Sequence, residues 1–326
     1  MKKFLAIQIK QIGDCIVTEP IFHAIKKTYP ESKTFFLVSK KISPLFQKNP
    51  YIDEVIPYYF NNPLKMLLEF FGKKFDFIFD FLGNPRSRML LFFMKGEKIG
   101  FKKRGSFFFY DISVERNKFP EYAVKTKLRL LEAAGIKGEV HIPQIYLTQD
   151  ERIKFDAYFE KLKKPVVAIS PTSRRQARRW KKEYFAQLAD KLKDDFEVVF
   201  VWGPGEIEYV KSIVAMTKSK PLISPFLDLR ELASFLSRCD LLVSNDNGPR
   251  HIAVAVGTPT LTIHGPSNPV SWKPPFENHR TLQADIDCKN CGKRICEDLK
   301  CMEQLKPDLV EKEIREMLKF SRRNYG

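Results

Sequence analysis

The sequence has no apolar run of the length that a membrane-spanning helix requires. Such a helix needs about 18 or more consecutive apolar residues, and no stretch of this chain reaches that length. The apolar part of its start, MKKFLAIQIKQIGD, is also too short for a signal peptide. We therefore expect a cytoplasmic protein.

Two glycine-rich nucleotide motifs are missing as well. No G-x-G-x-x-G follows the first expected strand, and no G-x-x-x-x-G-K-[ST] occurs anywhere in the chain. A nicotinamide dehydrogenase or a P-loop ATPase would carry one of these motifs, because their glycines let the backbone approach the phosphates. The sequence therefore gives no motif support for either of these two classes of protein.

Positive charge is abundant: 56 Lys and Arg against 39 Asp and Glu give a net charge of +17. Such a charge indicates an anionic partner, which is nucleic acid, a phosphorylated metabolite or an acidic lipid surface. In the densest basic stretch, 95–110, cations alternate with aromatic residues, a mixture suited to an anionic and partly apolar surface. The alternative, which the stretch alone slightly favours, is a solvated loop beside core phenylalanines.

The length and the apolar pattern predict two α/β domains. A single core stops growing at about 250–300 residues, and this chain has 326, of which 44% are hydrophobic. Strand-length apolar runs alternate with amphipathic segments, which is typical of parallel sheets. The expected strands are 4–9, 34–39, 53–58, 75–81 and 98–101, then 166–171, 197–203, 221–226, 241–246 and 260–265. We expect two doubly wound Rossmann-like domains, 1–160 and 161–326, facing each other across a ligand cleft. A last helix near 307–324 either caps the second sheet or crosses back to the first.

Asp14 is the most prominent candidate in the first domain. Gly13 permits a tight turn after the first strand, and Asp14 then falls at the start of the first helix. One interpretation is a helix cap, a role for which aspartate is well suited. The other is a general base, which the helix N-terminus would keep ionised but make weaker.

Three loops of the second domain carry candidate anion ligands. Thr172 and Ser173 follow a strand and precede four arginines, 174, 175, 178 and 179, which form either a phosphate clamp or a solvated charge run. Glu206 follows the next strand, either as a partner of a helix dipole or as an acceptor for ribose hydroxyls.

The third loop lies in SNDNGPRHIAVAVGTPTLTIHGPSNP, residues 244–269. A short helix starts there at Asn247 or Gly248, with Pro249 in its first turn, and its free N–H groups suit a pyrophosphate. His251 either donates a hydrogen bond to a phosphate or is a satisfied core histidine.

Four of the six cysteines form the pattern C-x2-C-x4-C-x4-C: Cys288, Cys291, Cys296 and Cys301. This spacing favours a tetrahedral structural zinc site. Paired disulfides, which a cytoplasmic location disfavours, and free thiols are the alternatives. We interpret Cys15 and Cys239 as buried core residues.

Several of these segments together resemble a known family. The stretches IGDCIVTEPIFHAIKKTYPESKTFFLVS, NPYIDEVI, RRWKKEYFAQLADKL and SNDNGPRHIAVAVGTPTLTIHGPSNPVSW are similar to the ADP-heptose:lipopolysaccharide heptosyltransferases of glycosyltransferase family 9. The resemblance runs through nearly the whole chain.

The resemblance implies the fold and the activity of that family. Its members have two facing Rossmann-like domains in the GT-B arrangement, with the nucleotide sugar on the carboxyl-terminal domain and the lipid-linked acceptor on the other. It implies inverting transfer of heptose from ADP-heptose to the lipopolysaccharide inner core, without a required cofactor or catalytic metal. It also implies a monomer on the cytoplasmic face of the inner membrane and no nucleic-acid partner.

The same resemblance assigns roles to individual residues. Asp14 falls on the candidate base. The nucleotide-sugar residues are Thr172, Ser173, Arg178, Glu206, Asp246, Asn247, Gly248 and His251, and the acceptor residues are Asp80, Asn84, Arg86 and Arg88. In two places the chain departs from the family: Asn247 replaces a hydroxyl residue, and Tyr122 stands where a histidine is common.

Two alternatives stay open. The first is the same fold and chemistry with another nucleotide sugar or another polysaccharide acceptor, because pocket contacts decide between such substrates. The second, more remote, is a non-enzymatic binder of nucleic acid or anionic membrane, which would explain the charge but not the loop motifs.

Overall fold

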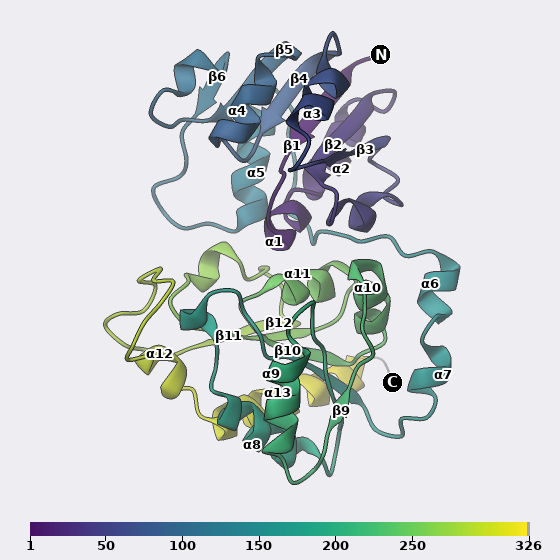
Figure 1. Ribbon diagram of the computed structural model, residues 1–326, viewed down its shortest axis with the longest axis vertical. Coiled ribbons are helices and arrows are strands. Elements are labelled where there is room, and N and C mark those ends of the chain that lie inside the picture. Colours follow the sequence, from purple (N-terminus) through teal and green to yellow (C-terminus); the bar gives the residue numbers. More distant parts are fainter. Residues whose placement is uncertain (325–326) are drawn as a thin grey trace. The chain divides into compact units, whose positions relative to one another are not determined.

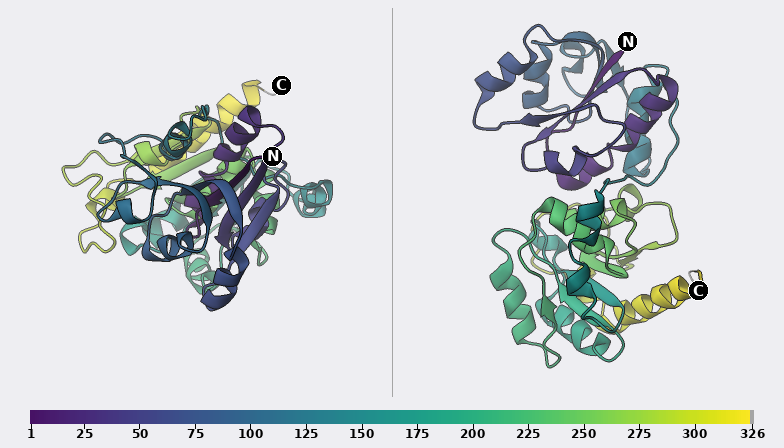
Figure 2. Two further views of the ribbon diagram at one scale, coloured as in Figure 1. Left: turned by 90° about the horizontal axis from the view of Figure 1, so that it is seen from above. Right: turned by 90° about the vertical axis from the view of Figure 1, so that its right-hand side faces the viewer.

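The computed structural model describes residues 1–324, which form two compact units, Met1–Tyr146 (unit 1) and the residues from Leu147 onward (unit 2). Each unit contains one six-stranded parallel sheet packed with helices (Figures 1 and 2). The prediction of two doubly wound α/β units is therefore confirmed. The division falls before helix α6 (Gln149–Ile153), earlier than the expected residue 160. The facing of the two units across a cleft stays a prediction.

The sheet of unit 1 has the strand order β3-β2-β1-β4-β5-β6, and all neighbouring pairs are parallel. Its strands are β1 (Lys3–Ile7), β2 (Lys33–Ser39), β3 (Glu54–Tyr58), β4 (Lys74–Asp80), β5 (Lys95–Phe101) and β6 (Ile112–Val114). The order reverses between β1 and β4, which makes their carboxyl ends the usual ligand position of such a sheet. Five of these strands coincide with predicted ones, and β6 was not predicted.

The helices of unit 1 are α1 (Ile12–Ile16), α2 (Pro20–Thr28), α3 (Pro63–Phe70), α4 (Pro85–Leu91) and α5 (Ala123–Glu132), with 3₁₀ turns η1 (Ser43–Phe46) and η2 (Ser106–Phe108). The core is built from the inner faces of the strands and helices, for example Ile7, Leu37 and Ile78. Because helices pack on the sheet, the central strands read as continuous apolar runs in the sequence.

The sheet of unit 2 has the order β12-β11-β10-β7-β8-β9 and is also fully parallel. Its strands are β7 (Val166–Ser170), β8 (Glu197–Phe200), β9 (Leu222–Ile223), β10 (Leu241–Asn245), β11 (Thr260–His264) and β12 (His279–Gln283). The order reverses between β7 and β10, so their carboxyl ends are the expected ligand position. The edge strand β12 was not predicted, because its polar residues hide the strand pattern.

The helices of unit 2 are α6, α7 (Asp156–Phe159), α8 (Lys182–Leu192), α9 (Ile207–Ala215), α10 (Leu229–Ser237), α11 (Gly248–Ala255), α12 (Lys300–Glu303) and α13 (Pro307–Asn324), with turns η3 (Gln176–Arg178) and η4 (Pro269–Ser271). The Arg230 guanidinium of α10 bonds Glu151 of α6, which ties the linker helices to unit 2. Helix α13 packs against α8 and contributes Val310 and Ile314 to the hydrophobic core of unit 2. Within residues 1–324, no helix is long and apolar enough to cross a membrane.

Candidate functional site

Asn245, at the end of β10, fastens the loop after β7 to the centre of the unit 2 sheet. Its Oδ1 accepts a hydrogen bond from the Trp180 backbone N–H at 3.0 Å, and its Nδ2 donates to the Pro171 carbonyl at 2.6 Å. The loop between these two points contains Thr172, Ser173 and Arg178. The carboxyl ends of β7 and β10 therefore hold the predicted clamp residues in one place.

Asp246 is the centre of a buried charge cluster at these strand ends. Its Oδ2 lies 2.8 Å from Nη1 of Arg178 and accepts a hydrogen bond from Ser267 Oγ at 2.7 Å. Its Oδ1 lies 3.9 Å from Nη2 of Arg250. Burial alone would raise the pKa of Asp246, but the charges of His264, Arg250 and Arg178 outweigh it and hold the pKa far below its usual range. Asp246 is thus a permanent carboxylate that positions two arginines.

The basic loop before α8 is partly built into the fold: Arg175, Arg178 and Arg179 are half-buried, whereas Arg174 is exposed. The Arg179 Nε donates to the Ser173 carbonyl at 2.7 Å. Burial, and then the positive charges of Arg178 and Arg294, lower the pKa of Arg175. Nε of Arg178 is buried and has no hydrogen-bond partner within the part of the chain that the structure describes. Guanidinium groups held close together in this way favour an anion between them, because an anion relieves their mutual repulsion.

Asn247 is the N-cap of α11, so the predicted start of this helix is confirmed. Its Oδ1 accepts from the Arg250 backbone N–H at 3.2 Å, while its Nδ2 donates to Ser170 Oγ and to the Thr172 carbonyl, each at 2.9 Å. A hydroxyl residue could cap the helix but could not span these groups, since its oxygen sits one atom closer to the backbone. The departure from the family pattern thus gives an extra bond between β7 and α11.

His251 lies in the first turn of α11 and is buried. Its Nε2 lies 2.7 Å from Nη2 of Arg250, and its ring meets Trp272 edge to face. Burial, and then the charge of Arg250, hold the pKa of His251 well below its ordinary value, so the ring is neutral and Nε2 accepts the hydrogen bond. This arrangement favours the interpretation of His251 as a satisfied core histidine. A direct contact of His251 with a phosphate stays a proposal.

Glu206 is the N-cap residue of α9, and its Oε2 accepts a hydrogen bond from the Gly203 backbone N–H at 2.9 Å. One carboxylate oxygen therefore closes the turn after β8. The turn keeps the carboxylate at the carboxyl end of the sheet, next to the strand β7 whose loop carries the arginines. Contact with a ribose stays a prediction.

Asp14 lies inside α1, whose N-cap is Gln11, so the interpretation of Asp14 as the capping residue is wrong. Burial lowers the pKa values of two nearby cations, Lys127 and Arg116, and the charge of the Asp14 carboxylate opposes this effect in both. Lys127 is buried in α5 and donates from Nζ to Gln8 Oε1 at 2.6 Å. Burial outweighs the influence of Asp14 and lowers the pKa of Lys127 to about 8. Asp14 therefore lies close enough to two buried or half-buried cations for the charges to interact.

Asp80, at the end of β4, holds the acceptor loop that the resemblance implies. Its carboxylate accepts four hydrogen bonds, from the backbone N–H groups of Leu82 and Gly83 and from the hydroxyls of Ser87 and Tyr110, at 2.7 to 3.0 Å. The Tyr110 ring reaches Asp80 across Gly100, where a Cβ would lie only 2.3 Å from the ring. The hydrogen bonds of Asp80 are thus made to its own loop and to Tyr110, which follows η2.

The other acceptor candidates surround this carboxylate. Asn84 caps α4 through the backbone N–H groups of Arg86 and Ser87. Nε and Nη2 of Arg88 are buried without hydrogen-bond partners among residues 1–324. Burial lowers the pKa of Lys103, and the positive charges of Arg116 and Arg88 lower it further, so these three cations lie near one another. Lys103 donates from Nζ to the carbonyls of Leu82 and Gly83, so Arg88 and Lys103 place two positive charges beside the loop after β4.

Lys127, Arg116, Lys103 and Arg294 are further candidate residues that were not named individually from the sequence, although Lys103 lies in the basic stretch 95–110. A signal existed for Lys127, which falls on the apolar side of α5 between Val124 and Leu131, a position where a charged residue demands a partner. The three others lie in irregular segments without periodicity, and Tyr122, the position of the second departure, is the buried N-cap residue of α5.

The four-cysteine segment covers the arginine loop. Its Arg294 carbonyl accepts from the Ala177 backbone N–H at 3.2 Å, and its Cys296 N–H donates to Gln176 Oε1 at 3.3 Å. All four cysteines are free thiols, and burial and then the other three sulfurs raise the pKa of Cys301. The four sulfurs thus lie near one another, although no group of three or more metal-binding side chains in coordinating geometry occurs among the described residues. Zinc at these cysteines stays a proposal.

Residues 65–302 match the sequence model of glycosyltransferase family 9 (heptosyltransferase). A lipopolysaccharide core heptosyltransferase, OpsX, of Haemophilus influenzae is 26% identical over 84% of this chain and 82% of its own length. Lipooligosaccharide heptosyltransferase 2 of Campylobacter jejuni is 25% identical over 94% of this chain and 96% of its own.

Solved structures of the same kind share the fold. A glycosyl transferase family 9 protein from Veillonella parvula superimposes with a TM-score of 0.86 at 22% identity, covering 97% of both chains. The E. coli ADP-heptose lps heptosyltransferase II gives 0.82 at 18% identity, covering 99% of this chain and all of the other. E. coli heptosyltransferase WaaC, solved with ADP-2-deoxy-2-fluoro heptose, gives 0.74 at 19% identity, covering 96% of this chain and 99% of the other.

Proposed function

Because the chain belongs to glycosyltransferase family 9, we propose that it transfers heptose from ADP-heptose to the lipopolysaccharide inner core with inversion at the anomeric carbon. The observation that carries the proposal is the buried cluster at the ends of β7 and β10. There the single carboxylate of Asp246 holds Arg178 and Arg250, with Arg175 and Arg294 nearby.

The donor's diphosphate fits this cluster. The arginines outnumber the carboxylate, so their charge is not balanced until an anion binds. Near these arginines lie two residues of the loop after β7, Thr172 and Ser173. Gly248 begins α11 and His251 lies in the first turn of this helix, where free N–H groups favour phosphate oxygens. Glu206 is positioned to accept hydrogen bonds from a ribose. WaaC, a structural neighbour, was solved with ADP and with a fluorinated ADP-heptose.

The acceptor reacts at Asp14. Its carboxylate takes the proton from an acceptor hydroxyl while that oxygen forms a bond to the anomeric carbon on the face opposite the leaving group. The bond from this carbon to the diphosphate breaks, ADP leaves with the electron pair, and the arginines stabilise its charge. Arg88, Lys103 and Arg116 fit phosphate or carboxylate groups of a lipid-linked acceptor.

The proposed setting of this reaction is the cytoplasmic face of the inner membrane, where the protein would act on a lipid-linked acceptor as a peripheral monomer. Neither the proton transfer to Asp14 nor the anion binding by the arginines requires a cofactor. Zinc at Cys288, Cys291, Cys296 and Cys301 would be structural, since all four ligands of a tetrahedral ion would be protein sulfurs.

Replacing the proposed base tests the reaction. We expect Asp14→Asn to abolish turnover while ADP binding, measured by calorimetry, stays within twofold, because the arginine cluster lies in the other unit. The matched control is Asp194→Asn, at an exposed position in the turn between α8 and β8, and it should be as active as the wild type. Retained turnover in Asp14→Asn would refute the role of Asp14.

The donor is identified by a panel of ADP- and UDP-sugars with release of free nucleotide as the readout. We expect ADP-heptose to give the highest kcat/KM. A higher value for another nucleotide sugar would favour the alternative of the same chemistry on a different substrate.

A further inference from the structure

Large apolar side chains are exposed in unusual number on three successive helical elements of unit 1, which are separated by strands β4 and β5. Six of them are between 65% and 76% exposed, namely Leu64, Leu68, Phe71, Phe92, Phe107 and Phe108. They belong to α3, to the ends of α3 and α4, and to η2. We call this surface the α3–α4–η2 face. A protein surface in water rarely gathers so many large apolar groups without a partner.

These elements are neighbours in space as well as in sequence. Helices α3 and α4 contact each other and lie side by side on the sheet of unit 1 (Figure 1). Phe60, just before α3, lies under the guanidinium of Arg86 in α4, 5.6 Å from ring centre to Cζ. Phe92, just after α4, packs edge to face on Phe109 beside η2, with 5.3 Å between ring centres. The exposed side chains therefore form one continuous region.

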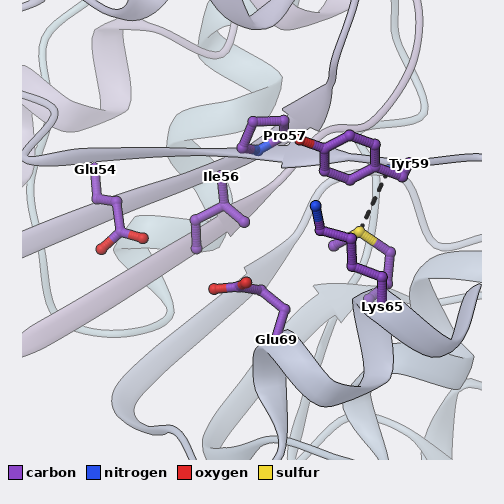
Figure 3. A pocket seen from close by; sticks show the side chains of 7 residues that line it. Glu54, Ile56, Pro57, Tyr59, Lys65 and Glu69 are labelled. Carbon is purple, nitrogen blue, oxygen red and sulfur yellow. Dashed lines mark hydrogen bonds between the residues drawn. The ribbon is translucent and has the colours of Figure 1, made fainter. Parts of the chain in front are cut away.

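The fold does not need these side chains for its core. On the inner side of α3, Met66 and Phe70 are buried, and Met66 Sδ accepts a hydrogen bond from the Tyr59 N–H above the hollow between β3 and α3 (Figure 3). Leu64, Leu68 and Phe71 point to the opposite side of the same short helix. A helix that serves only one core carries polar residues there, so the second apolar side indicates a second apolar environment.

Positive charge accompanies the apolar groups. Residues 60–119 contain twelve Lys and Arg and six Asp and Glu. Exposed cations stand on each of the three elements or next to them, for example Lys65, Lys95, Lys102 and Arg104. Aromatic and leucine side chains framed by lysine and arginine are the combination that binds the headgroup region of an anionic bilayer.

We propose that the α3–α4–η2 face docks onto a bilayer leaflet that contains anionic lipids. This inference rests on the proposed function, since docking would bring unit 1, the proposed acceptor unit, to a lipid-linked substrate. It differs from the surface expected from the sequence, 95–110, in its extent: Phe101 and Tyr110 of that stretch are buried, and α3 and α4 supply most of the exposed apolar groups.

Vesicle co-sedimentation of the full-length protein tests the proposal. We expect binding to vesicles of equimolar phosphatidylglycerol and phosphatidylcholine and little binding to pure phosphatidylcholine. The double variants Leu68→Ser/Phe71→Ser and Phe107→Ser/Phe108→Ser should each bind at least about tenfold more weakly, because each loses two inserting side chains. Met216→Ser/Phe226→Ser removes two exposed apolar side chains of unit 2 and is the matched control.

The outcomes separate this proposal from the proposed function. Circular dichroism and thermal unfolding should be unchanged in both patch variants, and turnover on a delipidated, water-soluble core acceptor should match the wild type. Equal vesicle binding by patch and wild-type proteins, or an equal loss in the unit 2 control, would overturn the docking face. So would a wild type that binds no vesicles and elutes as a dimer that the patch variants dissociate. If the wild type showed no turnover on the soluble acceptor, the transfer reaction would be refuted and the docking face would not be affected.

Discussion

Arg178 and Asp246 form a buried ion pair in which Nη1 lies 2.8 Å from Oδ2. The two residues are far apart in sequence, and each belongs to a different loop at the carboxyl end of the unit 2 sheet. The pair joins the arginine loop to the strand that leads into α11. It therefore links the stability of unit 2 to the arrangement of the arginines that we propose to bind the diphosphate.

Asp246→Asn should destabilise the protein by about 3–5 kcal/mol, because two buried arginines lose the charge that compensates them. Urea unfolding measures the change. The double variant Arg178→Gln/Asp246→Asn should be less destabilised than Asp246→Asn alone, since one uncompensated charge is then removed. Additive losses would contradict the pairing.

ADP binding should be weakened in Arg178→Lys, because lysine keeps the positive charge but lacks the fork of hydrogen-bond donors that a guanidinium presents.

Lys127 should impose an alkaline limit on activity. Its pKa is lowered to about 8 by burial, so above that pH it loses the positive charge that acts on Asp14. Because this attraction should hold the carboxylate of the proposed base in position, we expect kcat/KM to fall above pH 8 in the wild type and by roughly tenfold in Lys127→Met, the loss that corresponds to one pKa unit of charge interaction.

Lys127→Arg is the matched control, because an arginine keeps its charge throughout this range. The decline above pH 8 should be absent in this variant while turnover at pH 7 is retained. A pH–rate profile of Lys127→Arg with the same alkaline limb as the wild type would show that another group titrates there.

Glu19 should make the protein less stable as the pH rises from about 4.3 to 7. Burial raises the pKa of Glu19 to about 7 against the opposing hydrogen bonds from Asn49 and the Gln144 N–H. In this window the folded state keeps a proton that the unfolded state, with a pKa of about 4.3, has released. The stability that is present at low pH is therefore lost as the pH rises, by about 4 kcal/mol in total. Unfolding midpoints measured across this range should show a slope that Glu19→Gln lacks. Parallel profiles of the two proteins would contradict this.

The four-cysteine segment should couple metal content to ADP affinity. If it holds zinc, elemental analysis gives one ion per chain, and chelation exposes four further thiols to titration. Because this segment bonds the arginine loop through Ala177 and Gln176, removal of the ion should weaken ADP binding. Cys288→Ser should weaken it likewise, and Cys239→Ser, a buried cysteine outside the segment, should not. Four reactive thiols without zinc would contradict the site.

Much of the fold follows from local pattern. Strands such as β1 and β7 are continuous apolar runs between polar turns, and that pattern is visible in any parallel sheet with both faces covered. Asn247 at the start of α11 was also predictable, because Asn caps helices and Pro249 fits the first turn. The edge strands β6 and β12 escaped prediction because they are short or polar, and pairing to a neighbour alone makes them strands.

The sequence by itself determined the α/β class, the two-unit organisation, the family resemblance and the positions of Asp14, Arg178 and Asp246 in the segments that follow β1, β7 and β10. Only the tertiary structure decided what surrounds them: that Asp246 holds arginines from separate loops, that Lys127 reaches Asp14 from α5, and that apolar groups of α3, α4 and η2 share one face. The physical reason is that propensity and periodicity act over a few residues. Charge pairing and exposure depend on distances between segments that only folding brings together.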